Sequence, residues 1–239
     1  MLILAYGACG VIMTLLFTRL SPAVEAGPSP GAARGKEGTA RPLLGLHASR
    51  GVVMKLSVLF GLDAFAGGFI LQSLIAYWFH ARFGAGVDFI GEVLFAANLL
   101  AAVSALLAAR IAAKIGLVNT MVFTHIPSNV LLILVPLMPT LPLAAGLLVL
   151  RFSISQMDVP TRQSYTMAVV SPDERSAASG VTTIARSLGA SVSPVLAGLL
   201  MASPALLAFP FYIAGGVKIV YDLLLYAGFR TLKPEEERV

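Results

Sequence analysis

The run FIGEVLFAANLLAAVSALLAAR, residues 89–110, decides what kind of protein this chain is. A bilayer core about 30 Å thick is crossed by a helix of roughly 20 predominantly apolar residues. The run meets that length and carries one charge, Glu92, before its terminal Arg110. The whole chain is 57% hydrophobic and 12% charged, whereas soluble domains carry about 25% charged residues. We therefore predict an all-α, polytopic membrane protein.

Six further windows of comparable length lie to either side of this run, at residues 2–19, 56–79, 118–138, 141–159, 179–200 and 207–229. They predict four parts: a leading transmembrane helix (1–19), a basic Gly/Pro-rich cytoplasmic linker (20–54), a six-helix transmembrane bundle (55–230) and a cytoplasmic tail (231–239). The first window has no positive segment ahead of it, unlike a signal peptide. We expect it to be a true span, as though the chain had been cut just before a helix.

Lysine and arginine alternate between the connections. The linker with its flanks, two intermediate loops and the tail together hold thirteen, whereas the intervening connections hold one, Arg82. By the positive-inside rule, the linker and the C-terminus face the cytoplasm. The sequence therefore predicts a multi-pass protein of the cell (inner) membrane. Because the basic residues lie in connections and not on an aromatic-rich stripe, nucleic acid is excluded as a partner.

Enzyme and metal motifs are absent from the sequence. Its single cysteine, Cys9, excludes an internal disulfide, and its three histidines match no zinc template. It holds no Walker loop, no Gly-x-Ser-x-Gly elbow and no His-Glu-x-x-His helix. We expect neither enzymatic activity nor a metal or cofactor.

The segment AARIAAKIG, residues 108–116, joins two predicted spans by a short basic loop that ends in glycine. A leading span, a long basic linker, six more spans and a cytoplasmic C-terminus follow one another in an order that resembles the C-terminal half of a major facilitator superfamily transporter. On that resemblance the first span is the sixth of twelve, and the bundle holds helices seven to twelve. Arg110, Lys114 and Gly116 resemble the second copy of the family's loop motif, although Ala113 stands where an acidic residue is usual.

The later segments support the same resemblance. MDVPTRQ at 157–163 and SPDERSA at 171–177 resemble the loop between the tenth and eleventh helices. The stretch from Gly180 to Gly198, with Ser193-Pro194 between, has the small-residue texture of the eleventh helix.

Charged groups inside a span are costly, by about 2.5–3.5 kcal/mol on insertion scales, so each one is a functional hypothesis. Asp63 and Arg151 are predicted roughly 12–13 Å from the cytoplasmic ends of their helices. The resemblance places them on the seventh and tenth helices, which line the family's central cavity. An ion pair between them either holds the bundle together or opens as a proton or substrate arrives, and both interpretations stay open.

Further candidates for the substrate or ion pathway are Arg186 and the uncharged Gln72, Asn98 and Gln156. Arg186 is interpreted either as a cavity residue or as a hydrogen-bond donor between helices. His125 is a weaker candidate for a proton relay, because the resemblance places its helix at the periphery. Four other residues receive structural interpretations: Lys218 and Asp222, one helical turn apart, are expected to satisfy each other, and Tyr77 and Trp78 to anchor the interface.

The resemblance implies secondary active transport of a small solute by alternating access, coupled to protons, and the apolar cavity texture of Phe65 and Phe69 favours an efflux-type permease or antiporter. The expected partners are the lipid bilayer, a small-molecule solute, protons, and an opposing half that is either a missing N-terminal segment or a second subunit. The alternative is a truncated or non-transporting helical module that acts through a partner subunit.

Overall fold

The computed structural model describes residues 2–19 and 45–232, which belong to two units, residues 1–41 and 42–239. The first unit contributes helix α1 (Leu2–Thr18). Most of the predicted linker, residues 20–44, and the end of the predicted tail, residues 233–239, lie outside the described residues.

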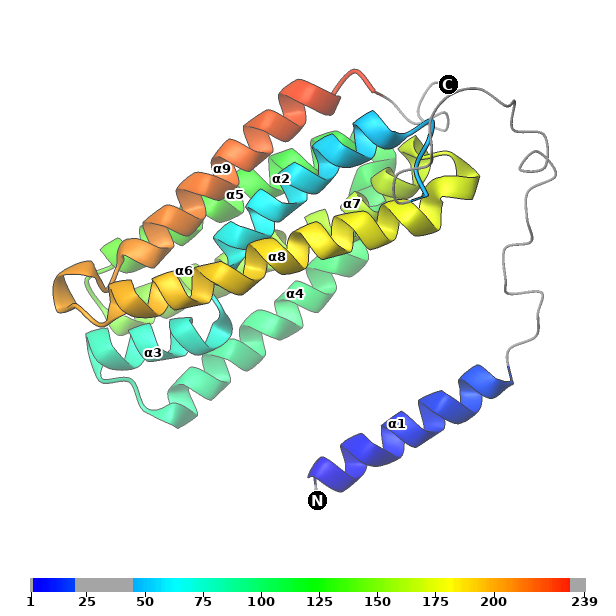
Figure 1. The fold of residues 1–239 in the computed structure, drawn as a ribbon. Helices are drawn as coiled ribbons and strands as arrows, with labels where there is room; N and C mark the ends of the chain where they lie inside the picture. The colour runs from blue at the N-terminus through cyan, green and yellow to red at the C-terminus, as the bar shows by residue number, and fades with distance from the viewer. Residues whose placement is uncertain (1, 20–44, 233–239) are drawn as a thin grey trace. The chain divides into compact units, whose positions relative to one another are not determined.

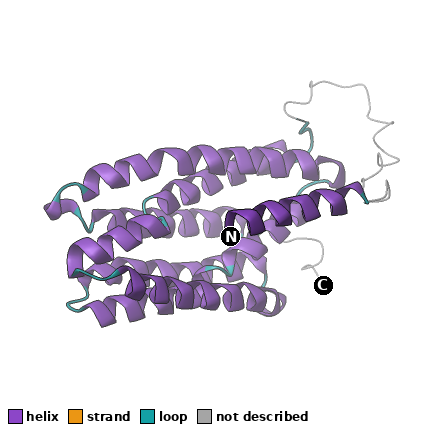
Figure 2. Ribbon diagram, turned by 90° about the horizontal axis from the view of Figure 1, so that it is seen from below, coloured by secondary structure: helices purple, strands orange, loops and turns teal. Residues whose placement is uncertain are grey.

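The second unit is a bundle of α-helices joined by short connections (Figure 1). Over the described ranges, the ribbon contains helices and loops but no strand (Figure 2), as the all-α prediction requires. The helices are α2 (Arg50–Gly68), α3 (Gln72–Phe83), α4 (Val87–Ile115), α5 (Leu117–Leu134), α6 (Leu141–Ser155), α7 (Asp158–Val169), α8 (Arg175–Met201) and α9 (Phe209–Phe229).

Five helical segments of the described chain are long and apolar enough to cross a membrane: Arg50–Phe83, Val87–Ile115, Leu117–Leu137, Pro172–Met201 and Pro204–Phe229. Four of them contain a predicted window and Leu117–Leu137 covers the window 118–138 up to its last residue, so the polytopic membrane fold is confirmed. The other two windows, 2–19 and 141–159, contain shorter helices, α1 of 17 residues and α6 of 15 residues.

The predicted span 141–159 and the loop after it need correction. α6 stops at Ser155, and after a break at Gln156 and Met157 the chain turns helical again as α7. Residues 158–169, assigned in part to a cytoplasmic loop, are therefore helical. The physical reason is their mixed composition: α7 is not apolar overall, so hydropathy alone does not reveal it.

The closest helix packing joins α2 to α8, which lie side by side across the front of the bundle (Figure 1). Glycines permit this approach. A Cβ atom at Gly189 would lie 2.2 Å from the backbone oxygen of Gly61, and one at Gly68 would lie 2.1 Å from the hydroxyl of Ser193. Small residues at such crossings let two backbones meet, which is the main source of van der Waals contact between helices in lipid.

Hydrogen bonds join the segment just before α2 to the connection between α7 and α8. Glu174, fully buried there, accepts hydrogen bonds from the backbone N–H groups of His47, Ala48 and Ser49. The His47 ring also contacts the Asp173 carboxylate at 2.8 Å. Glu174 thus satisfies N–H groups at a helix start that would otherwise lack partners.

The largest hydrophobic cluster includes Trp78, which is 1% exposed and packs its ring 4.9 Å from that of Phe211. The predicted aromatic anchor is therefore wrong for Trp78, because α3 turns this face into the bundle. Tyr77, the residue before it, is exposed. Phe69, proposed as a cavity residue, also belongs to this cluster, and Phe65 packs against it.

A continuous apolar face remains uncovered on α8. Its exposed side chains recur at helical spacing: Ile184, Leu188, Val192, Val195 and Leu199. Exposed apolar surface of this extent in a polytopic bundle is suited to lipid contact.

Candidate functional site

Asp63, buried in the middle of α2, is the centre of an ion-pair network that joins three helices. Its Oδ2 accepts a hydrogen bond of 2.8 Å from Nη1 of Arg162 in α7, and its Oδ1 binds Nζ of Lys218 in α9. All three side chains are nearly inaccessible. Two cations on one carboxylate form a connected network in which removal of Asp63 would leave both without their shared partner.

Arg162 is the functional residue that the sequence interpretation missed. It was assigned to a cytoplasmic loop, yet α7 carries it into the bundle, where it is 3% exposed. Asp158, one turn earlier on α7, lies 3.4 Å from its guanidinium, and Phe60 lies under it at 5.3 Å. A spacing of four residues between Asp158 and Arg162 was the available signal for a helix here.

The predicted pair of Asp63 with Arg151 is wrong. Arg151 is buried on α6, as expected, but within the described residues the ion pairs of Asp63 are with Arg162 and Lys218 instead. The guanidinium of Arg151 lies 5.1 Å from the ring of Phe152. Arg162 takes the place expected for Arg151 because the chain breaks after α6, and the helix that follows brings Arg162 to Asp63.

Asp222 on α9 forms a second buried pair. Its carboxylate contacts Nδ1 of His125 at 2.8 Å and accepts a hydrogen bond of 3.1 Å from Asn129, both on α5. The expected pair of Lys218 with Asp222 is therefore wrong, since Lys218 points to Asp63. His125, a weak candidate from sequence, is 4% exposed and belongs to the buried polar interior.

Three of the predicted pathway residues line one open cavity of about 600 Å³ between α3, α4, α6 and α7: Gln72, Asn98 and Gln156. The Gln72 amide donates a hydrogen bond of 2.9 Å to the Asn98 side chain. Gln163 and Phe152 are among the other residues that line this cavity. The arrangement offers amide groups on an otherwise apolar surface, which is how proteins orient small organic ligands.

A second cavity, of about 360 Å³, adjoins the first because both share Gln163. Its wall includes Phe60, Arg162 and the predicted Arg186. The structure thus places Arg186 beside the Asp63 network. The Nε atom of Arg186 is buried and has no hydrogen-bond partner within the described residues. This atom therefore gives no support to the interpretation of Arg186 as a hydrogen-bond donor between helices.

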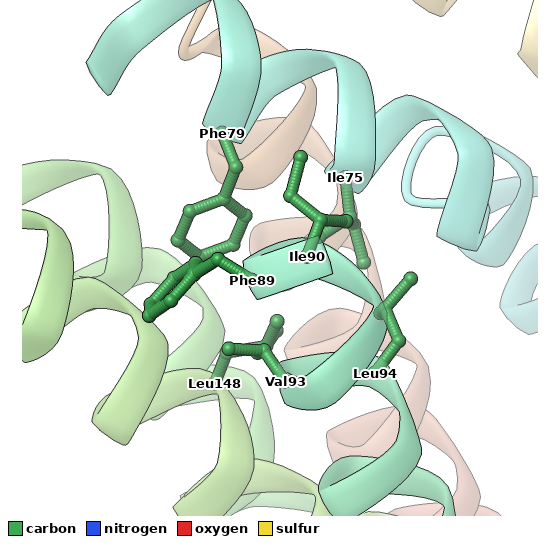
Figure 3. A pocket seen from close by; sticks show the side chains of 7 residues that line it. All are labelled: Ile75, Phe79, Phe89, Ile90, Val93, Leu94 and Leu148. Carbon is green, nitrogen blue, oxygen red and sulfur yellow. The ribbon is translucent and has the colours of Figure 1, made fainter. Parts of the chain in front are cut away.

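A third pocket is purely apolar and has no room for water (Figure 3). Ile75 and Phe79 of α3 converge there with Phe89 and Ile90 of α4 and with Leu148 of α6. It is an apolar contact region between helices and offers no polar group to orient a ligand.

The predicted loop motif forms a one-residue link between α4 and α5. Gly116 has φ of +87°, and its N–H donates a 2.8 Å hydrogen bond to the carbonyl of Ala112. Glycine is favoured in this left-handed region because it has no Cβ. Arg110 and Lys114 are exposed near this end of α4. Near the opposite end of α4, Glu92 is exposed.

Comparison with known proteins gives two matches. The chain is 31% identical over 179 residues to an uncharacterized membrane protein of Saccharomyces cerevisiae, a match that covers 74% of this chain and 40% of the yeast protein. The chain thus spans less than half of that relative. No solved structure matches. The sequence profile of the Major Facilitator Superfamily matches residues 1–194 and 56–239, which together cover the chain. The chain therefore belongs to the major facilitator superfamily.

Proposed function

We propose that this bundle is the cavity-bearing half of a proton-coupled secondary transporter of efflux type, which exports a small organic solute by alternating access. Membership of the superfamily supports membrane transport of a solute. The single observation that carries the finer proposal is that Arg162 of the buried Asp63 network lines a cavity, which shares Gln163 with a second, larger cavity.

Asp63 is the proposed coupling carboxylate. Arg162 belongs both to its ion pair and to the cavity wall, so a ligand and a proton would act on one connected group of charges. Protonation of Asp63 would neutralise the carboxylate that holds Arg162 and Lys218, and would loosen the contact of α2 with α7 and α9. Buried ionisable residues at membrane depth serve as proton relays in many transporters.

The His125–Asp222 pair is the proposed second protonation site. It lies on α5 and α9, and α9 also carries Lys218. Because Lys218 and Asp222 are one turn apart on the same helix, a change of charge at either would act on the other. This arrangement supports a proton route along α9 between the two buried pairs.

Alternating access needs a second half against which this bundle rocks. The open cavities present Gln72, Asn98, Gln156 and Gln163 to that side in the proposed assembly. The opposing half is an N-terminal segment, a separate chain or a second copy of this one. The rival proposal is a helical module that never transports and acts through a partner.

The test reconstitutes the full chain, with its opposing half where one is identified, into vesicles preloaded with fluorescein or rhodamine 123. The wild-type protein should release one of these dyes faster under an inward proton gradient. Asp63→Asn should abolish this acceleration, whereas Glu92→Gln, at an exposed position, should retain it. Gradient-driven release that persists in Asp63→Asn would exclude Asp63 as the coupling group. Absence of release of either dye in the wild type would favour the non-transporting module.

A further inference from the structure

Two arginines of the bundle lack an ion-pair partner. Asp63 and Asp158 are matched by Arg162 and Lys218, and Asp222 is matched by His125. The buried Glu174 accepts hydrogen bonds from backbone N–H groups. Among the described residues, the buried Arg151 and the half-buried Arg186 remain, and neither forms an ion pair.

A charge at membrane depth is expensive unless a partner compensates for it. Arg151 is 5% exposed, and the Nε atoms of Arg151 and Arg186 are buried without a hydrogen-bond partner in the described ranges. Arginine always keeps its proton in proteins, so the cost cannot be avoided by deprotonation. Of these two arginines, Arg186 lines a cavity, and an anion that enters there would supply it with a partner.

The cavity at Arg186 has the chemistry to receive one. Its wall carries Arg162 and Arg186 and no carboxylate. Arg162 already faces Asp63 and Asp158, which leaves the Arg186 guanidinium as the available partner. Gln163, Ser179 and Thr183 add side-chain donors, and all three are exposed to the cavity or its mouth.

The same cavity also has an apolar side. Phe60 and Met167 belong to its wall. It shares the lining residue Gln163 with the adjoining cavity of about 600 Å³, where Phe152 and Leu106 are among the lining residues. A charged group at Arg186 would therefore have room for an attached apolar body.

We propose that the cavity between α7 and α8 binds the carboxylate or phosphate group of an amphipathic organic anion, with Arg186 as the principal charge partner. This names the substrate class of the transporter and so rests on the proposed function. Arginine suits the task because its planar fork matches carboxylate and phosphate oxygens. The anion is either a free organic acid or a lipid headgroup, which share this chemistry.

The test is equilibrium binding to the purified full chain in detergent, without any gradient. The probes are 1-naphthoate and its uncharged isostere 1-naphthamide, followed through the thermal unfolding midpoint. The wild type should bind naphthoate at least about tenfold more tightly than naphthamide. Arg186→Gln should lose this preference, whereas Arg82→Gln, which removes an exposed positive charge on α3, should retain it.

Equal affinity for the two probes, no binding of naphthoate, or an unchanged preference in Arg186→Gln would overturn the proposal. If Arg186→Gln does not fold, Arg186→Lys, which keeps the charge, is measured in its place. The comparison of naphthoate with naphthamide on the wild type still tests whether the cavity prefers an anion. Competition separates the sources: displacement of naphthoate by lysophosphatidic acid but not by lysophosphatidylcholine identifies a lipid headgroup, and its absence identifies a free acid. Because no flux is measured, a failure of transport leaves this result intact.

Discussion

At the scale of single residues, the most consequential feature is the sharing of Asp63 between two cations. Within the described residues, Lys218 pairs with no carboxylate other than that of Asp63, whereas Arg162 has a second carboxylate in Asp158 at 3.4 Å. Breaking a buried ion pair by removing one partner costs about 3–5 kcal/mol, because the remaining charge stays buried without compensation. Lys218 is therefore the group that would suffer most from the loss of Asp63.

We predict that Asp63→Asn lowers the thermal unfolding midpoint strongly, and that adding Lys218→Met recovers part of the loss. The second change removes the cation that the first leaves unpaired, so the two effects are not additive. Unfolding of the purified variants in one detergent measures both, with Glu92→Gln as the exposed control. Losses that simply add would show that Lys218 does not depend on Asp63.

At the scale of helices, the contact of α2 with α8 depends on positions without a side chain. A Cβ atom at Gly189 would lie 2.2 Å from the Gly61 oxygen and 3.2 Å from the Phe65 nitrogen. These are backbone atoms, so the helices must move apart to accept it. A Cβ atom at Gly198, on the same helix, would have no neighbouring atom within 4 Å.

We predict opposite effects for alanine at these two glycines. Gly189→Ala should destabilise the bundle, by about 1–3 kcal/mol or more, because overpacking separates α2 from α8. Gly198→Ala should be neutral or slightly stabilising, since alanine favours the helix by about 1 kcal/mol over glycine. Thermal unfolding of both variants under identical conditions tests this. Similar losses at both positions would mean that the α2–α8 contact is not limiting.

At the scale of the whole molecule, the corrected helix boundaries leave the predicted topology intact. Moving Arg162 from a loop into α7 removes one positive charge from that connection, but Arg175 remains close to it. The basic and non-basic connections still alternate, so the positive-inside rule gives the same orientation.

We predict that the turn before α6 is external and the connection before α8 is cytoplasmic. In a Cys9→Ser background, which removes the only cysteine of the sequence, Thr140→Cys should react with an impermeant maleimide on intact cells. Ser176→Cys should react only after permeabilisation. Both positions are exposed, so accessibility within the bundle does not limit the reaction. The reverse pattern would invert the orientation.

Composition and hydropathy were enough to predict the membrane class and the approximate position of the apolar helices, because the match of an apolar segment to bilayer thickness is a local property. They did not reveal α7, whose composition is mixed. The sequence also identified Asp63, Arg151 and Arg186 as charges at membrane depth, and Gln72, Asn98 and Gln156 as polar groups that the structure gathers around one cavity. These inferences need only composition and the rise of a helix.

Which charges form pairs became clear from the packing of the helices. Arg162 replaces Arg151 as the partner of Asp63, and His125 replaces Lys218 as the partner of Asp222. Partner choice depends on how each helix is rotated about its axis and on the break at Gln156 and Met157, which separates α6 from α7. Those rotations are set by close contacts between distant segments, such as Gly61 with Gly189, and no local pattern in the sequence records them.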